Sequence, residues 1–190
     1  IFYLFATLLV AGATHENTQW YQASFSYLGM TQSNSRYVFN LGLPFTGLLI
    51  IIWNIYFMQM FQILVDEGVV TPGAKKAIGR FILTIGILLA LVGIVRFGLG
   101  LMFNIIHDIS ATGMGIATGL LMLLAHRYVD RLPRVFYIYS VVAVILIIIA
   151  IPLKVLGYYS LTGLELTAFF MCGIWLLVFY RNIEQLVEQI

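Results

Sequence analysis

Long apolar segments alternate with short polar segments along the whole chain. Six of the apolar segments predict helices, at residues 1–13, 38–65, 78–103, 109–126, 135–153 and 162–180. About 20 predominantly apolar residues are enough to cross a bilayer as a helix. Because residue 1 already lies inside an apolar run, we expect the first segment to be the later part of a transmembrane helix. The pattern predicts an all-α bundle of six transmembrane helices, forming one domain over residues 1–190.

The longest polar connection, residues 15–36, lies between the first two predicted helices. Trp20, Tyr21, Phe25 and Leu28 would share one face of a helix, which favours a short helix lying in the membrane interface. An ordinary loop whose aromatic side chains sit at the headgroup level explains the same residues equally well.

Two of the predicted helices carry small residues at regular spacing. Those of the third helix are Gly86, Gly93 and Gly100, and those of the fourth are Ala111, Gly115 and Gly119. Small residues let two helix backbones approach closely in a membrane. We therefore expect tight helix packing at both faces, or a docking face there for a second copy of the chain or another membrane protein.

The composition agrees with a membrane protein, since 62% of the residues are hydrophobic and only 9% are charged. Soluble domains have about a quarter of their residues charged. The alternating strands of an outer-membrane barrel are absent from the pattern. A net charge of +2 predicts no nucleic-acid partner, and the single cysteine, Cys172, excludes an internal disulfide.

The basic residues predict the orientation of the bundle. On one side lie Lys75, Lys76, Arg80, Arg127, Arg131, Arg134 and Arg181. On the other side lie Arg36, Arg96 and Lys154. Because cytoplasmic connections carry the excess of Lys and Arg, we expect both termini in the cytoplasm and the protein in the plasma membrane. The connections 15–36, 104–108 and 154–161 then face outward.

Four ionisable residues are expected near the outward ends of three predicted helices: Arg96, His107, Asp108 and Glu165. An ionisable group at membrane depth costs at least ~2.5 kcal/mol by insertion scales, so each needs a partner or a purpose. Arg96 and Glu165 have opposite charge and similar expected depth. We therefore predict a buried ion pair between them, beside His107, in the wall of an outward-facing polar pocket.

A purely structural role explains the same residues without a pocket. Asp108 suits the N-cap of the fourth helix. Arg96 could extend its side chain to the outer headgroups, with Glu165 as its partner. His126, at the other end of the fourth helix, is expected to be interfacial.

His107 with Asp108 or Glu165 could act as a general acid and base on a lipid ester. A serine nucleophile, Ser24, Ser26 or Ser110, would need His107 within reach. No metal and no cofactor is expected. His107 and His126 lie at opposite ends of one helix, whereas two haem-ligating histidines lie at matching depth on facing helices. Lys154 follows Pro152 at a membrane edge, whereas a retinal Schiff base needs a buried lysine in the middle of a helix. No spacing of ligand residues indicates a zinc site.

The segment ASFSYLGMTQSNSRYVFNLGLPFTG resembles the first part of the sequences in a family of small six-helix bacterial and archaeal membrane proteins of unknown function. It is also distantly similar to the damage-regulated autophagy modulator and post-GPI-attachment lipid-remodelling group. The matching positions are Ser26-Tyr27-Leu28-Gly29, Phe39-Asn40, Gly93 and His107. Tyr27 stands where that pattern has an acidic residue. The resemblance implies an outward-facing polar site near lipid headgroups and no established reaction.

Three hypotheses for the function follow. The first is a membrane protein without catalytic activity that binds a lipid or a small amphiphile in its outward pocket. The expected ligand-binding residues are Arg96, His107, Asp108, Glu165, Ser26 and Asn40. The second is an intramembrane lipid hydrolase or acyltransferase, and the third is an accessory subunit of a membrane complex. Membrane lipids are the expected partners.

Overall fold

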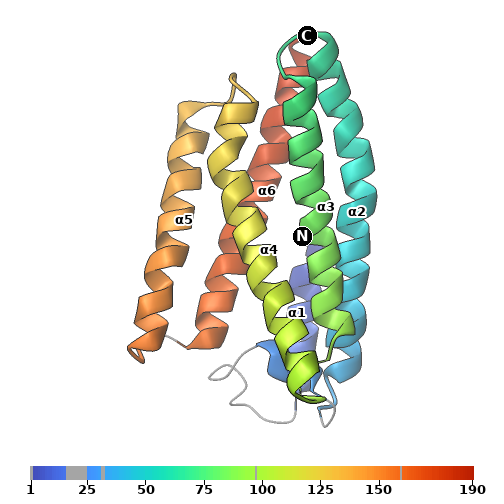
Figure 1. Cartoon of the computed structure of the whole chain (residues 1–190), viewed down its shortest axis with the longest axis vertical. Helices are drawn as coiled ribbons and strands as arrows, with labels where there is room; N and C mark the ends of the chain where they lie inside the picture. Colours follow the sequence, from blue (N-terminus) through green and yellow to red (C-terminus); the bar gives the residue numbers. More distant parts are fainter. Residues whose placement is uncertain (1, 16–24, 31–32, 97, 159) are drawn as a thin grey trace.

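The computed structural model describes residues 2–15, 25–30, 33–96, 98–158 and 160–190. These residues form six α-helices and one short 3₁₀ helix, η2, with no strand in the described ranges (Figure 1). The elements are α1 (Phe2–Thr14), η2 (Phe25–Gly29), α2 (Arg36–Asp66), α3 (Pro72–Ile94), α4 (Leu101–Tyr128), α5 (Arg134–Val155) and α6 (Leu161–Glu188).

Helices α2 to α6 are each long and apolar enough to cross a membrane. Large apolar side chains cover their outer faces, including Ile55 (61% exposed), Leu101 (78%) and Val135 (77%). Such a continuous apolar surface suits lipid and not water. Helix α1 has 13 described residues, which span about 20 Å against the ~30 Å of a hydrocarbon core. The chain is a multi-pass helical membrane protein.

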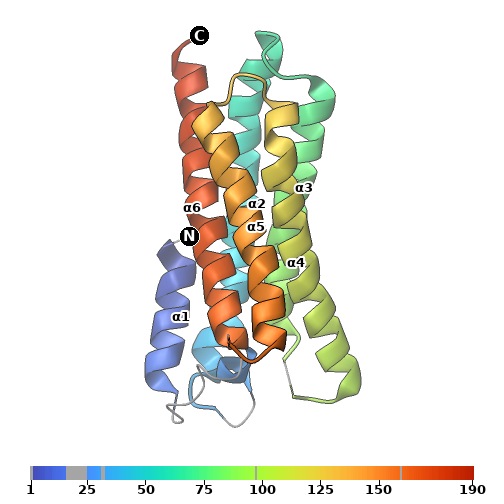
Figure 2. The ribbon, with the colours of Figure 1, turned by 90° about the vertical axis from the view of Figure 1, so that its left-hand side faces the viewer.

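The helices run alternately up and down the bundle (Figures 1 and 2). One end, here called the site end, holds η2, the α3–α4 connection at residues 95–100 and the α5–α6 connection at residues 156–160. The opposite end holds the α2–α3 and α4–α5 turns and the C-terminus. The site end therefore gathers segments that are far apart in the sequence.

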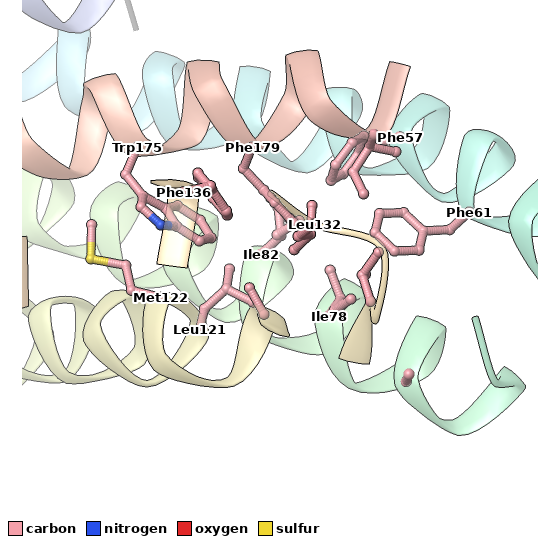
Figure 3. Close-up of a cluster of buried hydrophobic side chains, with 14 of the residues drawn as sticks. Phe57, Phe61, Ile78, Ile82, Leu121, Met122, Leu132, Phe136, Trp175 and Phe179 are labelled. Atoms are coloured by element: carbon pink, nitrogen blue, oxygen red, sulfur yellow. The ribbon is translucent and has the colours of Figure 1, made fainter. Parts of the chain in front are cut away.

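A core rich in aromatic side chains joins the five long helices away from the site end. Trp175, Phe179 and Phe136 stack on one another there, and Phe57 packs edge-on against Phe179 (Figure 3). The indole Nε1 of Trp175 donates to the hydroxyl of Ser140 at 2.7 Å. The core includes residues of α2, α3, α4, α5 and α6, so it holds the bundle together while leaving the site end free to form a cavity.

The third helix packs through its glycines, as predicted, and its partner is α2. A Cβ added to Gly86 would lie 2.9 Å from Ile51 Cγ1. One added to Gly93 would collide with Pro44 and lie 2.9 Å from Leu43 Cβ. Both glycines are therefore required for the close approach of α2 and α3.

The prediction of close packing at Gly115 and Gly119 of the fourth helix is wrong. Beyond the adjacent residues and the nearby backbone of α4 itself, no atom lies within 4 Å of a Cβ built on either residue. Gly100 likewise has no neighbour within 4 Å and lies just before α4 instead of inside α3. Spacing alone does not decide whether a small residue meets another backbone or open space.

The boundary between α3 and α4 also differs from the prediction. Helix α3 ends at Ile94 and α4 begins at Leu101, whereas the apolar pattern predicts 103 and 109. Val95 at the C-cap of α3 already has extended backbone angles, and Gly98 (φ 89°) and Gly100 (φ 133°) in the connection adopt angles that favour glycine. Gly100 occupies the N-cap of α4, so the expectation that Asp108 caps this helix is wrong.

Candidate functional site

The 3₁₀ helix η2 is held against the start of α2 by two hydrogen bonds. The Ser35 hydroxyl donates to the carbonyl of Leu28 at 2.7 Å, and the Asn40 amide donates to the carbonyl of Gly29 at 2.9 Å. A Cβ on Gly29 would lie 2.5 Å from Asn40 Oδ1 and 2.7 Å from Phe39 Cδ1. Only glycine fits this contact without displacing its neighbours.

The other end of η2 is held by α6. The backbone N–H of Phe25 donates to Glu165 Oε2 at 2.7 Å. The Phe25 ring is buried, with its centroid 6.0 Å from that of Phe169. Ser26 therefore lies on a short segment fixed on both sides by contacts that do not involve its own side chain.

Ser26 meets His107 of α4 across 81 residues of sequence. Its Oγ lies 2.7 Å from His107 Nε2, and His107 Nδ1 lies 3.0 Å from the carbonyl oxygen of Val95. A carbonyl oxygen can only accept, so in the neutral imidazole Nδ1 carries the proton and Nε2 accepts from the Ser26 hydroxyl. Ser26, His107 and the Val95 carbonyl form one hydrogen-bonded chain.

The early end of α3 makes the Val95 carbonyl available. Val95 follows the last helical residue and has extended backbone angles (φ −86°, ψ 91°). The last carbonyls of a helix have no partner within the helix. His107, about two turns into α4, is placed to satisfy this one.

These polar groups border a large apolar cavity. It has a volume of about 620 Å³ and is lined by residues of α1, η2, α2, α3, α4 and α6. Ser26, His107 and Glu165 line it at the site end, and Trp53 and Tyr180 line it further toward the opposite end. Most of the remaining lining is apolar, and no Lys or Arg belongs to the described lining. The volume lies within the ~300–1,000 Å³ of typical ligand pockets.

The predicted ion pair between Arg96 and Glu165 is not formed. Arg96 is exposed in the α3–α4 connection, and Glu165 instead accepts from the Phe25 amide. The pair was predicted on the assumption that Arg96 lies inside the third helix. Since α3 ends at Ile94, the guanidinium reaches the surface instead.

The remaining residues that the sequence predicts for the site either support the fold or lie at the surface. Asp108 is exposed and does not line the cavity. Asn40 does not line the cavity but supports η2 through Gly29. Ser110 is buried and donates to the Ile106 carbonyl of its own helix at 2.8 Å.

Some sequence-based expectations cannot be placed. Ser24, and Trp20 and Tyr21, which are expected at the membrane interface, lie outside the described residues. Within the described ranges, no three His, Cys, Asp or Glu side chains gather closely enough to hold a metal ion.

The sequence analysis names His107, Glu165 and Ser26, but it cannot choose among three serines as the partner of His107 and gives Glu165 the wrong partner. No local pattern links Ser26 to His107, because the contact depends on where η2 lies in the fold. The role of the Val95 carbonyl was missed, because the apolar run continues past Ile94 and hides the helix end. The two glycines at 98 and 100 are the signal that could have revealed it.

A family model described as "Protein of unknown function (DUF998)" matches residues 1–182 of the chain. No curated protein matches the chain, and no solved structure matches it.

Proposed function

We propose that this chain, which belongs to the DUF998 family of proteins of unknown function, binds a single-chain neutral lipid or a similar small amphiphile. The apolar chain of this ligand would occupy the cavity, and its polar end would meet Ser26, His107 and Glu165. The main support for this proposal is an apolar cavity of about 620 Å³ whose lining includes these three side chains at the site end.

The polar end would supply most of the selectivity. Lipid tails are as apolar as leucine, so an acyl chain gains little by moving from the bilayer into an apolar cavity. A hydrogen bond to Ser26 or His107 is available only at the site end. Each such bond contributes about 0.5–1.5 kcal/mol, which separates amphiphiles by the chemistry of their headgroups.

The lining favours a ligand without negative charge. A buried charge requires a partner of opposite sign, and the described lining offers neither Lys nor Arg. A hydroxyl or ester group needs only hydrogen bonds, which Ser26 and His107 can provide. A monoacylglycerol is the simplest lipid of this kind.

The site end would face outward across the plasma membrane. Of the ten Lys and Arg residues, seven lie at or near the opposite end, which the positive-inside rule assigns to the cytoplasm. The short resemblance around Ser26 and Asn40 to the lipid-remodelling group agrees with a lipid ligand. In this orientation the ligand would enter from the outer leaflet.

A docking role through the glycines of α3 has less support. Gly86 and Gly93 already pack against α2, so that face is filled within the chain. The open space beside Gly115 belongs to the cavity, which fits a small ligand better than a helix.

Tryptophan quenching tests the proposal on the full chain in detergent micelles. Trp53 lines the cavity, and Trp20→Phe with Trp175→Phe leaves it as the only tryptophan of three. The probe is a monoacylglycerol with a dibrominated stearoyl chain, which quenches nearby indole fluorescence. We expect saturable quenching that an excess of unbrominated monooleoylglycerol reverses.

A matched pair of variants locates the bound chain. Gly115→Leu places a side chain in the cavity, whereas Gly119→Leu, one turn further along α4, has equally open space but does not line the cavity. We expect Gly115→Leu to weaken quenching at least tenfold and Gly119→Leu to leave it unchanged. Equal effects of the two variants, or quenching that is not saturable, would contradict the proposal.

A further inference from the structure

We propose that Ser26 is a nucleophile, activated by His107, that takes the acyl group from an ester lipid bound in the cavity. This inference rests on the proposed function and adds a reaction to it. The serine hydroxyl, the imidazole base and a third group that orients the base form one chain of hydrogen bonds, at 2.7 and 3.0 Å. That geometry is the usual sign of an activated hydroxyl.

The Val95 carbonyl takes the place that a carboxylate holds in many serine hydrolases. It accepts from His107 Nδ1 and so keeps the lone pair of Nε2 directed at Ser26. His107 is only 2% exposed, which fixes the ring further. A backbone carbonyl thus orients the base.

The Ser26 hydroxyl is not needed to hold η2 in place. Hydrogen bonds from Phe25, Ser35 and Asn40 already anchor this segment, and Phe25 and Leu28 are buried in the apolar cluster at the site end. Ser26 itself lines the cavity beside His107. A hydroxyl in this position, bonded to a base and facing a ligand cavity, is placed to react with the ligand.

The reaction balances with water as the only co-reactant. Ser26 Oγ bonds to the ester carbonyl carbon as its proton passes to His107 Nε2. The bond from that carbon to the alcohol oxygen then breaks, and Nε2 returns the proton to the departing alcohol. The acyl group remains on Ser26.

Water restores the enzyme in a second step. It attacks the acyl carbon, gives one proton to His107 Nε2, and the carbon–Oγ bond breaks as that proton returns to Ser26. A fatty acid is released. Another lipid alcohol in place of water would receive the acyl group, so the same site would act as a hydrolase or as an acyltransferase.

The test uses a fluorophosphonate probe with a long alkyl chain, which phosphonylates activated serines. It is applied to the full chain in micelles, and the modified peptide is identified by mass spectrometry. We expect modification of Ser26 in the unaltered protein and none in Ser26→Ala. Because the first result needs no substitution, it does not depend on whether a variant folds.

Two variants test whether His107 acts as a base or only supports the structure. His107→Gln keeps hydrogen-bonding groups but removes the base, and we expect it to slow labelling at least 100-fold, the lower range for general-base catalysis. Ser110→Ala is the control, since Ser110 is also buried in α4 but bonds only to Ile106 in the hydrogen bonds described and does not line the cavity. It should label at the rate of the unaltered protein.

Outcomes distinguish this inference from the proposed function. Saturable quenching of Trp53 by the brominated lipid, without labelling of Ser26, would overturn the nucleophile and leave lipid binding intact. Labelling of Ser26 that is equally fast in His107→Gln would also overturn it. Labelling that depends on His107, in a protein that shows no quenching, would support the nucleophile and overturn the neutral lipid as its ligand.

Discussion

At the scale of single residues, the polar side chains of this bundle are paired with backbone groups more than with one another. Glu165 accepts from the Phe25 amide, Ser35 and Asn40 donate to carbonyls of η2, and His107 meets the Val95 carbonyl. Unpaired backbone groups are costly where no water can replace the partner. These side chains satisfy the irregular segments that border the cavity.

Glu165 should therefore matter as an acceptor and not as a charge. Glu165→Ala removes the carboxylate that accepts from the Phe25 amide and should lower the free energy of unfolding by about 1–3 kcal/mol. Glu165→Gln keeps an acceptor oxygen and should cost less. Thermal unfolding of the purified protein in detergent measures both changes.

Arg96→Ala is the companion to this experiment, because Arg96 is exposed and does not pair with Glu165. An exposed substitution of this kind changes stability by less than about 0.5 kcal/mol. If Arg96→Ala lowers the free energy of unfolding as much as Glu165→Ala, and the effects are not additive in the double variant, the result would support the ion pair after all.

At the scale of the elements, glycines have three different uses. Gly86 and Gly93 let α2 and α3 approach closely, Gly98 and Gly100 adopt positive φ in the break between α3 and α4, and Gly115 leaves room for the cavity. The same residue type thus packs two helices, breaks a helix and lines a cavity. Each use follows from what lies next to the missing side chain.

Gly93→Ala and Gly119→Ala should have opposite effects. The added methyl of Gly93→Ala collides with Pro44 and should destabilise the bundle by about 1–3 kcal/mol. That of Gly119→Ala meets open space and should be neutral or stabilising by up to ~1 kcal/mol, because alanine favours the helix.

Thermal unfolding in one detergent compares these two variants directly. Equal melting temperatures would mean that α2 and α3 separate easily at Gly93, contrary to the close contact described here.

At the scale of the whole molecule, two regions of the bundle have different packing. The aromatic core fills the space between the long helices toward the opposite end, whereas α6 packs mainly against α5 and touches α4 little. The cavity lies where α1, η2 and α6 complete the wall. The polar site belongs to no single helix and exists only in the assembled bundle.

The orientation of the bundle is tested by cysteine labelling in a Cys172→Ala background, which removes the only native cysteine. Tyr158 is 81% exposed in the α5–α6 connection, and Lys75 lies at the start of α3, at the opposite end. A membrane-impermeant maleimide added to intact cells should label Tyr158→Cys and spare Lys75→Cys. After the membrane is permeabilised, both should react, and the reverse pattern in intact cells would invert the topology.

The amino-acid sequence is enough to predict an all-helical membrane protein, because composition and the length of apolar runs are properties of the chain alone. It also indicated His107, Glu165, Ser26 and Asn40, since polar residues are rare and costly in an apolar chain. All five long helices are predicted in the correct order on this basis, and the largest difference lies at the boundary between α3 and α4.

Which of these residues come into contact depends on how the helices are arranged in three dimensions. The contact between Ser26 and His107 joins residues 81 positions apart in the sequence. The hydropathy pattern does not predict where η2 lies against α4 and α6. Hydropathy does not show the end of α3, because apolar residues continue beyond it, while the break lies in the backbone angles of Val95, Gly98 and Gly100. That local break moved Arg96 to the surface, placed His107 inside α4 and made the Val95 carbonyl its partner.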